Sequence, residues 1–138
     1  MMPDPASLQD FALRYTASWN SQKPASVAAF FAPNGSLSVN GVPSVGRAAI
    51  TEVAQKFMAA FPDMQLLMDG IVIHADRAVY SWTFFGSNTG PGGTGHKVRF
   101  SGFEVWKFGD NGLIAESQGQ FDSADYERQL QRGVENSD

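Results

Sequence analysis

The sequence predicts an α+β fold in which a curved antiparallel β-sheet wraps around helices from the N-terminal half of the chain. Apolar residues recur at helical spacing between residues 7 and 61, and from Gln65 onward apolar and polar residues alternate as in strands. Residues 98–122 read as two strands around Gly109-Asp110-Asn111-Gly112, a turn sequence that favours a hairpin. We therefore expect helices on one concave face of the sheet.

Composition limits the classes of protein and partner. The 138 residues, 43% of them hydrophobic, suit one globular domain over 1–138 with an ordered core of about 5–132. A net charge of −4 without a basic stripe argues against nucleic acid. Cysteine is absent, and His74 and His96 make no ligand set, so we predict no metal and no cofactor. Without a long apolar run or a targeting segment, we expect no membrane partner and a cytoplasmic protein.

Three helices are predicted before residue 64. Asp4 or Ser7 can cap the first, and its buried face is Leu8, Phe11, Ala12, Tyr15 and Trp19. Pro24 suits the first turn of the second, which we expect to bury Val27, Phe30 and Phe31 and to end at Pro33-Asn34-Gly35. Gly46 opens the third, which ends at Pro62-Asp63 and buries Ile50, Val53, Ala54, Phe57 and Phe61.

The remaining segments read as strands and one last helix. Ser36–Val39 and Val42–Val45 flank the turn dipeptide Asn40-Gly41. Two later strands turn inward Leu66, Met68, Gly70 and Val72, and then Ala78, Tyr80, Trp82, Phe84 and Gly86. Asp122 or Ser123 caps a final helix carrying Tyr126 and Leu130, and residues 133–138 should fray.

The hairpin at residues 98–122 predicts a pocket with an acid in its wall. With Asp110-Asn111 as a two-residue turn, Glu104 pairs with Ser117, and Gly102 with Gly119. The buried faces are then Val98, Phe100, Gly102, Glu104, Trp106 and Phe108, opposite Leu113, Ala115, Ser117, Gly119 and Phe121. Small residues around Glu104, flanked by aromatic ones, leave a void.

The pocket composition favours a compact apolar ligand, which aromatic side chains interrupted by glycine can enclose. We expect its lining to be Trp19, Val39, Phe57, Tyr80, Trp82, Phe84, Phe100, Gly102, Trp106, Ser117, Gly119 and Phe121. The opposite face of the sheet carries Phe85, Phe103 and Val105 among polar residues, and this predicts a homodimer through the outer face.

Glu104 on an apolar strand face needs a partner, water or a proton. One interpretation is structural: it reaches Arg47, Arg77 or Arg99, or a helix end. The other is functional: it is a pocket acid with a raised pKa that donates a hydrogen bond to a ligand oxygen alongside Tyr15. A buried tyrosine hydroxyl also needs a partner, and Glu104 is the natural one for Tyr15.

The order of these elements resembles the nuclear-transport-factor-2-like cone superfamily, and within it the SnoaL-like polyketide cyclases and the ketosteroid isomerases. The resemblance covers residues 7–132. It is carried by Arg14-Tyr15, Trp19-Asn20, Gly46-Arg47-Ala48-Ala49-Ile50, Phe61-Pro62-Asp63 and Val105-Trp106-Lys107-Phe108, in that order and spacing. It implies a cone with an internal pocket.

The resemblance also implies roles for individual residues. Tyr15 and Glu104 fall where ketosteroid isomerases keep a tyrosine and a protonated aspartate. In that family the aspartate is a carboxylic acid held neutral by its apolar surroundings. Val39 falls where those enzymes keep the aspartate that moves the proton. Gly119 falls where the polyketide cyclases keep a working aspartate. Both acids are missing here. The missing acid at Val39 makes steroid isomerisation itself an unsuitable assignment, and the missing acid at Gly119 makes the fit to the polyketide cyclases partial.

The sequence therefore leaves two interpretations. The first is a cofactor-independent isomerase, cyclase or dehydratase for a compact apolar carbonyl, enol or lactone compound, with Tyr15 and Glu104 as catalytic residues. Glu104 could instead be a general base if burial moves its pKa toward neutrality. The second is a non-catalytic module of the same fold that binds a hydrophobic ligand or serves as a dimeric accessory domain.

Overall fold

A computed structural model describes residues 2–134 as four helices and one six-stranded sheet. The helices are α1 (Pro5–Asn20), α2 (Pro24–Ala28), α3 (Arg47–Ala60) and α4 (Ser123–Arg132). The strands are β1 (Phe31–Val39), β2 (Val42–Val45), β3 (Gln65–His74), β4 (Arg77–Ser87), β5 (Lys97–Phe108) and β6 (Ile114–Phe121). This confirms the predicted α+β fold.

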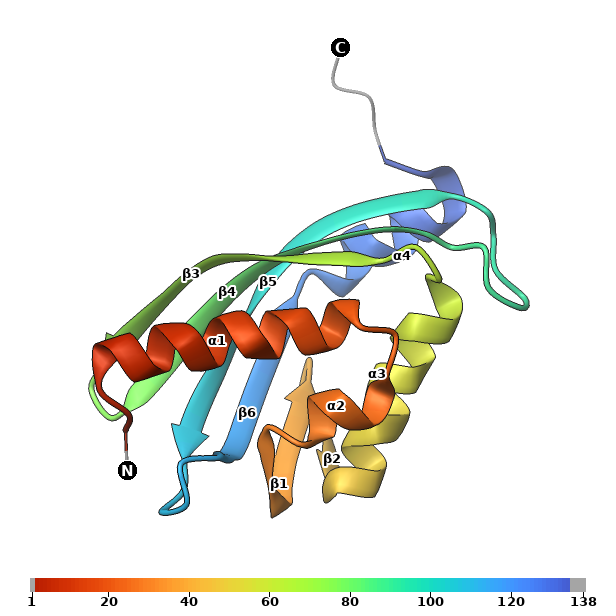
Figure 1. Cartoon of the computed structure of the whole chain (residues 1–138). Coiled ribbons are helices and arrows are strands. Elements are labelled where there is room, and N and C mark those ends of the chain that lie inside the picture. The colour runs from red at the N-terminus through yellow and green to blue at the C-terminus, as the bar shows by residue number, and fades with distance from the viewer. Residues whose placement is uncertain (1, 135–138) are drawn as a thin grey trace.

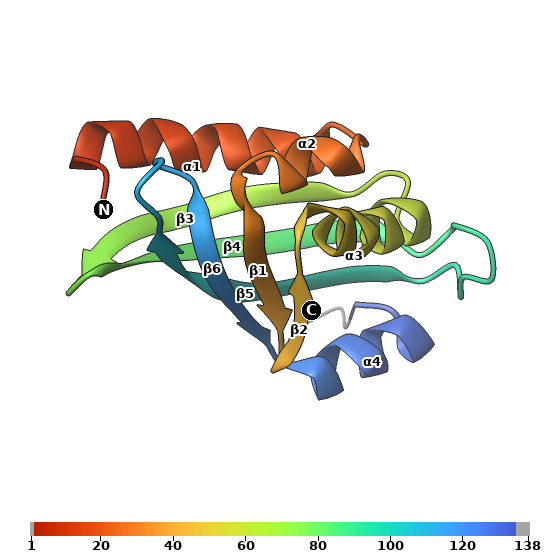
Figure 2. The same ribbon diagram turned by 90° about the horizontal axis from the view of Figure 1, so that it is seen from below.

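The long strands β3, β4 and β5 arch over α1, and α2 and α3 lie on the same side of the sheet (Figure 1). Seen from below, α2 follows on at the end of α1 and lies next to α3, while α4 lies beyond the ends of β1, β2 and β6 and beside β5 (Figure 2). The strand order is β2-β1-β6-β5-β4-β3. Neighbouring strands are antiparallel except β1 and β6, which run parallel. The core of the protein lies between the helices and the sheet.

Local signals set the predicted helix ends and the first turn. The side chain of Asp4 accepts the backbone N–H of Ser7 at 3.0 Å, and Asp122 accepts that of Asp125 at 3.0 Å. Of the two capping residues predicted for each of these helices, Asp4 rather than Ser7 caps α1, and Asp122 rather than Ser123 caps α4. Asn40 and Gly41 take positive φ angles of 50° and 84° between β1 and β2, as their turn dipeptide predicts.

The predicted second helix is too long. It ends at Ala28, and Phe31, expected on its buried face, is instead the first residue of β1 and is fully buried. Phe31 pairs with Ile114 of β6, more than eighty residues further along the chain. Helical spacing near Phe31 could not reveal this pairing, because its partner strand is distant in sequence.

A bulge changes the buried face of β3. The register with β4 shifts between Met68 and Gly70, so Asp69 is an extra residue in the strand. Beyond the bulge, Ile71 packs against the core, while Val72, predicted to face inward, is 60% exposed. Strict alternation fails here because one inserted residue exchanges the two faces.

The hairpin between β5 and β6 has a longer turn than predicted. Residues 109–113 connect the strands, with the N–H of Gly109 donating to the carbonyl oxygen of Leu113 at 2.9 Å. Glu104 consequently pairs with Gly119, not Ser117. This shift of two residues keeps the same side chains inside. Nearer the turn a bulge makes Ile114 the buried residue in place of the predicted Leu113 and Ala115.

The outer face of the sheet carries exposed apolar side chains. Phe103 on β5 is 40% exposed, whereas Phe85 and Val105 are half-buried. The homodimer predicted through this face stays a prediction. Within residues 2–134, the helices are too short or too polar to span a membrane.

Candidate functional site

Four residues form one row across the sheet. Val39 of β1 is the partner of Gly119 on β6, Gly119 is the partner of Glu104 on β5, and Glu104 is the partner of Tyr80 on β4. The positions that the resemblance compares with the family's acids therefore lie side by side. Glu104 is the one acidic member of this row.

Glu104 is buried and held by three neutral donors. The Tyr15 hydroxyl donates to Oε1 at 3.0 Å and approaches Oε2 at 3.2 Å. Trp106 Nε1–H and the Ser117 hydroxyl both donate to Oε1, at 2.9 and 2.7 Å. A carboxylate oxygen has about two lone pairs, so Oε1 is saturated and Oε2 keeps spare acceptor capacity. An added proton therefore belongs on Oε2.

Burial raises the pKa of the Glu104 carboxyl above its usual value. The hydrogen bonds from Trp106, Ser117 and Tyr15 act in the opposite direction, since each stabilises the charged form. Desolvation is the larger effect because Glu104 is only 7% exposed and no cation is bonded to it among the described residues. The carboxyl thus has the raised pKa expected of a pocket acid.

The ion-pair interpretation of Glu104 is wrong. The Arg47 guanidinium donates to the carbonyl oxygen of Phe31 at 3.0 Å. Arg77 forms an ion pair with Asp76, its neighbour in sequence, at 2.8 Å. Arg99 lies over the Phe85 ring, 5.1 Å from its centroid. None of the three arginines forms an ion pair with Glu104.

Tyr15 is fully buried on α1, behind Glu104. Burial raises the pKa of its phenol well above 10, and the nearby Glu104 charge raises it further. The indole N–H of Trp19 opposes this rise in pKa, although it does not meet hydrogen-bond geometry with the phenol. Tyr15 therefore remains protonated and acts toward Glu104 as a donor.

Aromatic packing fixes this network from the side of β4. The rings of Tyr80 and Trp106 stack with centroids 4.8 Å apart and planes 15° from parallel. The Tyr80 hydroxyl lies 2.5 Å from that of Thr16 on α1. Burial, and to a lesser degree the Glu104 charge, raises the Tyr80 pKa, so this phenol too stays neutral. Glu104 therefore stands among fixed, uncharged groups.

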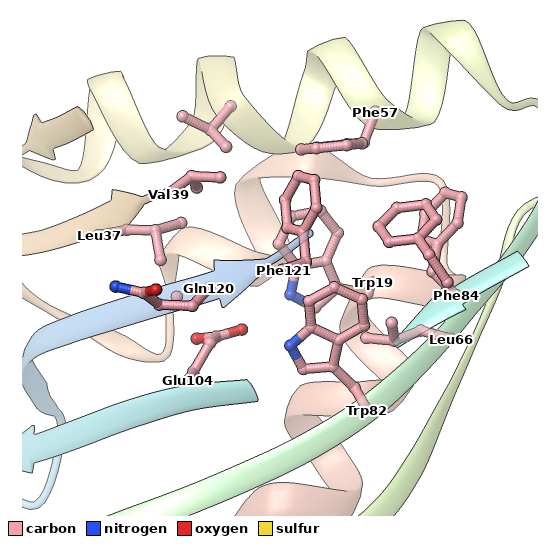
Figure 3. A pocket seen from close by; sticks show the side chains of 13 residues that line it. Trp19, Leu37, Val39, Phe57, Leu66, Trp82, Phe84, Glu104, Gln120 and Phe121 are labelled. Carbon is pink, nitrogen blue, oxygen red and sulfur yellow. The ribbon is translucent and has the colours of Figure 1, made fainter. Parts of the chain in front are cut away.

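A cavity of about 60 Å³ lies above Glu104, between α1, α3 and the sheet. Its lining is almost entirely apolar, and Glu104 is the one carboxylate in it. Figure 3 shows Glu104 below, Phe57 of α3 above, and the nitrogen edges of Trp19 and Trp82 turned toward the side where Glu104 lies. The lining is Trp19, Leu37, Val39, Val53, Phe57, Leu66, Trp82, Phe84, Phe100, Glu104, Gly119, Gln120 and Phe121.

Partly exposed side chains indicate where the cavity reaches solvent. Val53 and Phe57 on α3, Val39 at the end of β1 and Phe121 at the end of β6 are all half-buried lining residues. The fully buried members, by contrast, lie toward Glu104 and Trp19. The cavity therefore opens toward solvent between α3 and the ends of β1 and β6.

The structure brings most of the predicted lining together. The cavity contacts Trp19, Val39, Phe57, Trp82, Phe84, Phe100, Glu104, Gly119 and Phe121. Outside its lining lie Tyr15, Tyr80, Gly102, Trp106 and Ser117. Tyr15, Trp106 and Ser117 instead hydrogen-bond Glu104 from behind. Gly102 is covered by the Trp82 ring, 2.5 Å from where a Cβ atom would stand.

Four lining residues were not among those predicted to line the cavity: Leu37, Val53, Leu66 and Gln120. Val53 and Leu66 were predicted to face inward, but their position at the cavity depends on how α3 crosses the sheet. Leu37 belongs to β1, whose parallel pairing with β6 the sequence does not indicate. Strand alternation places Gln120 on the outer face, and no sequence pattern indicated that it lines the cavity. The described residues hold no group of three or more potential metal ligands.

Comparison with known proteins now identifies this architecture. The protein family described as "SnoaL-like polyketide cyclase" matches residues 9–130 of this chain. The chain belongs to this family. The resemblance to the SnoaL-like and nuclear-transport-factor-2-like proteins is thereby confirmed. No curated protein matches the sequence closely enough to count as a relative.

Solved structures share the fold of this SnoaL-like protein at low sequence identity. TsrD from Streptomyces laurentii has a TM-score of 0.80 and 22% identity, over 94% of this chain and 98% of TsrD. A phenazine biosynthesis-related protein from Pseudomonas aeruginosa has a TM-score of 0.71 and 15% identity, over 100% of this chain and 91% of its own. TerC, co-crystallised with polyporic acid, has a TM-score of 0.72 and 16% identity, over 88% and 96%.

Proposed function

We propose that this SnoaL-like protein is a cofactor-independent enzyme that moves a proton on a compact apolar carbonyl, enol or lactone compound, with Glu104 as the proton carrier. The observation that carries the proposal is the lone carboxyl in an apolar cavity, with one oxygen saturated by donors and the other keeping spare acceptor capacity beside a single longer contact from Tyr15. The raised pKa of Glu104 supports it, because a carboxylate with a pKa above that of an ordinary glutamate is a stronger base. TerC, of the same fold, was co-crystallised with a small molecule.

Tyr15, Trp106 and Ser117 serve in this proposal as positioning residues. They hold the carboxyl so that Oε2 is the oxygen that takes or gives the proton. Tyr15 was expected to donate to the ligand itself, but its hydroxyl is engaged by Glu104 and lies outside the cavity lining. The lining residues supply an apolar surface that excludes water from the carboxyl.

The elementary step is enolisation. The Glu104 carboxylate removes a proton from the carbon beside the ligand's carbonyl. The C–H electron pair forms a C=C bond, and the carbonyl π electrons move to the oxygen as an enolate. The reverse step returns a proton from the Glu104 carboxylic acid to carbon. Isomerisation, aldol cyclisation and dehydration all share this step, and it needs one proton carrier only.

Hydrogen exchange tests the proposal without knowledge of the natural substrate. Acetophenone in D2O should exchange its methyl protons faster with the protein than with buffer, as followed by proton NMR. Glu104→Gln should lower the protein-dependent rate at least about 100-fold, the usual contribution of a general base. Glu52→Gln, on the exposed side of α3, is the matched control and should keep the rate.

The second candidate is a binding module, and one observation favours it. Val39 and Gly119 line the cavity in the row with Glu104, yet neither carries an acid. A reaction that needs two proton carriers then has only one. If acetophenone binds, exchange stays at the buffer rate, and Glu104→Gln changes affinity only modestly, the binding module is the correct assignment.

A further inference from the structure

The indole N–H of Trp19 is a buried donor without a hydrogen-bond partner among the described residues. The residue is 8% exposed, and Nε1 itself is shielded from solvent. Leaving such a donor unpaired costs about 1–3 kcal/mol. Buried polar groups without partners are rare in native proteins, and each requires an explanation.

The Trp19 ring and the end of α1 that carries it are held by neighbouring contacts. Phe57 packs edge-on against it, with ring centroids 6.2 Å apart. The following residue, Asn20, anchors the end of α1 to β3. Its side chain accepts the N–H of Leu66 at 2.7 Å and donates to the Leu66 carbonyl oxygen at 2.9 Å. The donor therefore keeps its place relative to the cavity.

The N–H is directed into the polar side of the cavity. Trp19 is a lining residue, and Figure 3 shows its nitrogen edge turned toward the side where Glu104 lies. The Tyr15 phenol oxygen is a protein acceptor close enough for the Trp19 N–H to lower the Tyr15 pKa. The Tyr15 hydroxyl donates its hydrogen bond to Glu104 and keeps acceptor capacity, but the Trp19 N–H does not meet hydrogen-bond geometry with it.

We propose that Trp19 Nε1–H binds the oxygen of the ligand, and that the ligand class is a flat conjugated ketone or its enol. An indole N–H only donates, so its partner must be an acceptor such as a carbonyl or enolate oxygen. Aromatic walls on both sides favour a flat body. This inference rests on the proposed function, since it assigns the oxygen whose charge grows while Glu104 moves the proton.

The cavity is too small to enclose a whole aromatic ketone, so in this proposal only the oxygen end of the ligand lies inside it. An engineered apolar cavity of about 150 Å³ accepts benzene, whereas this one measures about 60 Å³. The oxygen end of the ligand fits beside Trp19 and Glu104. The rest of the ligand lies in the mouth, between the half-buried side chains of Phe57 and Phe121.

Two probes of the same shape test the donor. Acetophenone and α-methylstyrene differ only in a C=O group in place of C=CH2. Trp19→Phe keeps the aromatic ring and removes the N–H. We expect it to weaken acetophenone binding about 3- to 10-fold, as one net hydrogen bond predicts, and to leave α-methylstyrene unchanged. Phe57→Leu, a wall residue without a donor, should weaken both probes alike.

Indole signals of the unaltered protein give a second readout that does not depend on a variant folding. The chain has three tryptophans, hence three Nε1–H signals. Acetophenone should move the Trp19 signal downfield, and α-methylstyrene should not. Equal shifts from the two probes, an unchanged affinity ratio in Trp19→Phe, or no acetophenone binding overturns the inference.

The two proposals fail separately. If hydrogen exchange depends on Glu104 but the preference for acetophenone over α-methylstyrene does not depend on Trp19, the enzyme assignment holds and Trp19 is not the donor. Trp19-dependent selectivity without exchange keeps the ketone site and removes the enzyme assignment.

Discussion

The Tyr15 hydroxyl and the Glu104 carboxyl are joined by a buried hydrogen bond of 3.0 Å between α1 and β5, residues 89 positions apart in the chain. Because the phenol pKa is raised by burial, the proton stays on Tyr15 and the bond keeps one direction. The acid is therefore oriented by a neutral donor, and it has no counter-ion among residues 2–134. Its charge state depends on burial and on three hydrogen bonds, each of which can be removed singly.

Trp106 should report the protonation of Glu104. Its Nε1–H donates to Oε1 at 2.9 Å, so its NMR shift must move when the carboxylate becomes a weaker acceptor. We expect the Trp106 indole signal to titrate with a midpoint above 4.5, the ordinary value for glutamate, because burial raises the Glu104 pKa. Glu104→Gln should abolish the titration. A midpoint at or below 4.5 would contradict the assignment of a pocket acid.

Removing a donor should raise the Glu104 pKa further. The Ser117 hydroxyl stabilises the carboxylate at 2.7 Å, and the Tyr15 hydroxyl does so at 3.0 Å. In Ser117→Ala and in Tyr15→Phe the charged form loses a bond that the neutral acid needs less. The Trp106 indole titration measures both variants. Ser101→Ala, on the outer face of β5, is the control and should leave the midpoint in place.

The sequence predicted the site through one alternating strand. Glu104 was predicted to face inward because its neighbours on that face are apolar. This prediction remained correct although the β-turn was mispredicted, because the strand pairing shifted by two residues and kept the same side chains inside. Most of the lining contributed by α1, α3, β4 and β6 followed from helical and strand spacing in the same way, whereas the lining positions of Val53 and Gln120 did not. Each of these signals is local to its own segment.

The pairing of distant strands and the positions of the bulges could not be predicted from the sequence. Nothing near Phe31 indicates that it begins a strand parallel to β6, because the partner lies at Ile114. Asp69 in β3 gives no sign that it interrupts alternation. The direction in which Tyr15 uses its proton depends on the distance between α1 and β5, which only tertiary packing sets.

Stability should fall as pH rises through the Glu104 titration. A folded-state pKa above the unfolded value means that the native state binds more protons than the unfolded state between the two pKa values. The free energy of unfolding therefore decreases from about pH 4.5 upward, until the folded carboxyl is fully ionised. Urea unfolding at several pH values should show this slope as the difference between the unaltered protein and Glu104→Gln. An opposite slope in that difference is incompatible with a raised pKa.

The outer face of the sheet should mediate the homodimer predicted from sequence. Phe103 is 40% exposed on that face, beside the half-buried Phe85 and Val105. Sedimentation equilibrium should give twice the chain mass of 14.9 kDa. Phe103→Glu should then lower the mass to that of one chain, because a charge cannot be buried without a partner. Val42→Glu, equally an exposed apolar residue but on β2, should keep the dimer. A single-chain mass for the unaltered protein removes the prediction.

Gly102 should be far less tolerant of a side chain than Gly70. A Cβ atom at Gly102 would stand 2.4 Å from the carbonyl oxygen of Gln120 and 2.5 Å from the Trp82 ring, so both backbone and cavity wall must move. Overpacking of this kind costs about 1–3 kcal/mol, and we expect Gly102→Ala to lower the free energy of unfolding by that amount. At Gly70 nothing lies within 4 Å of the new Cβ, and Gly70→Ala should change stability by less than about 0.5 kcal/mol. Because the Trp82 ring is displaced only in the first variant, acetophenone affinity should fall in Gly102→Ala and hold in Gly70→Ala. Equal stabilities for the two variants would mean that Trp82 does not cover Gly102 as described.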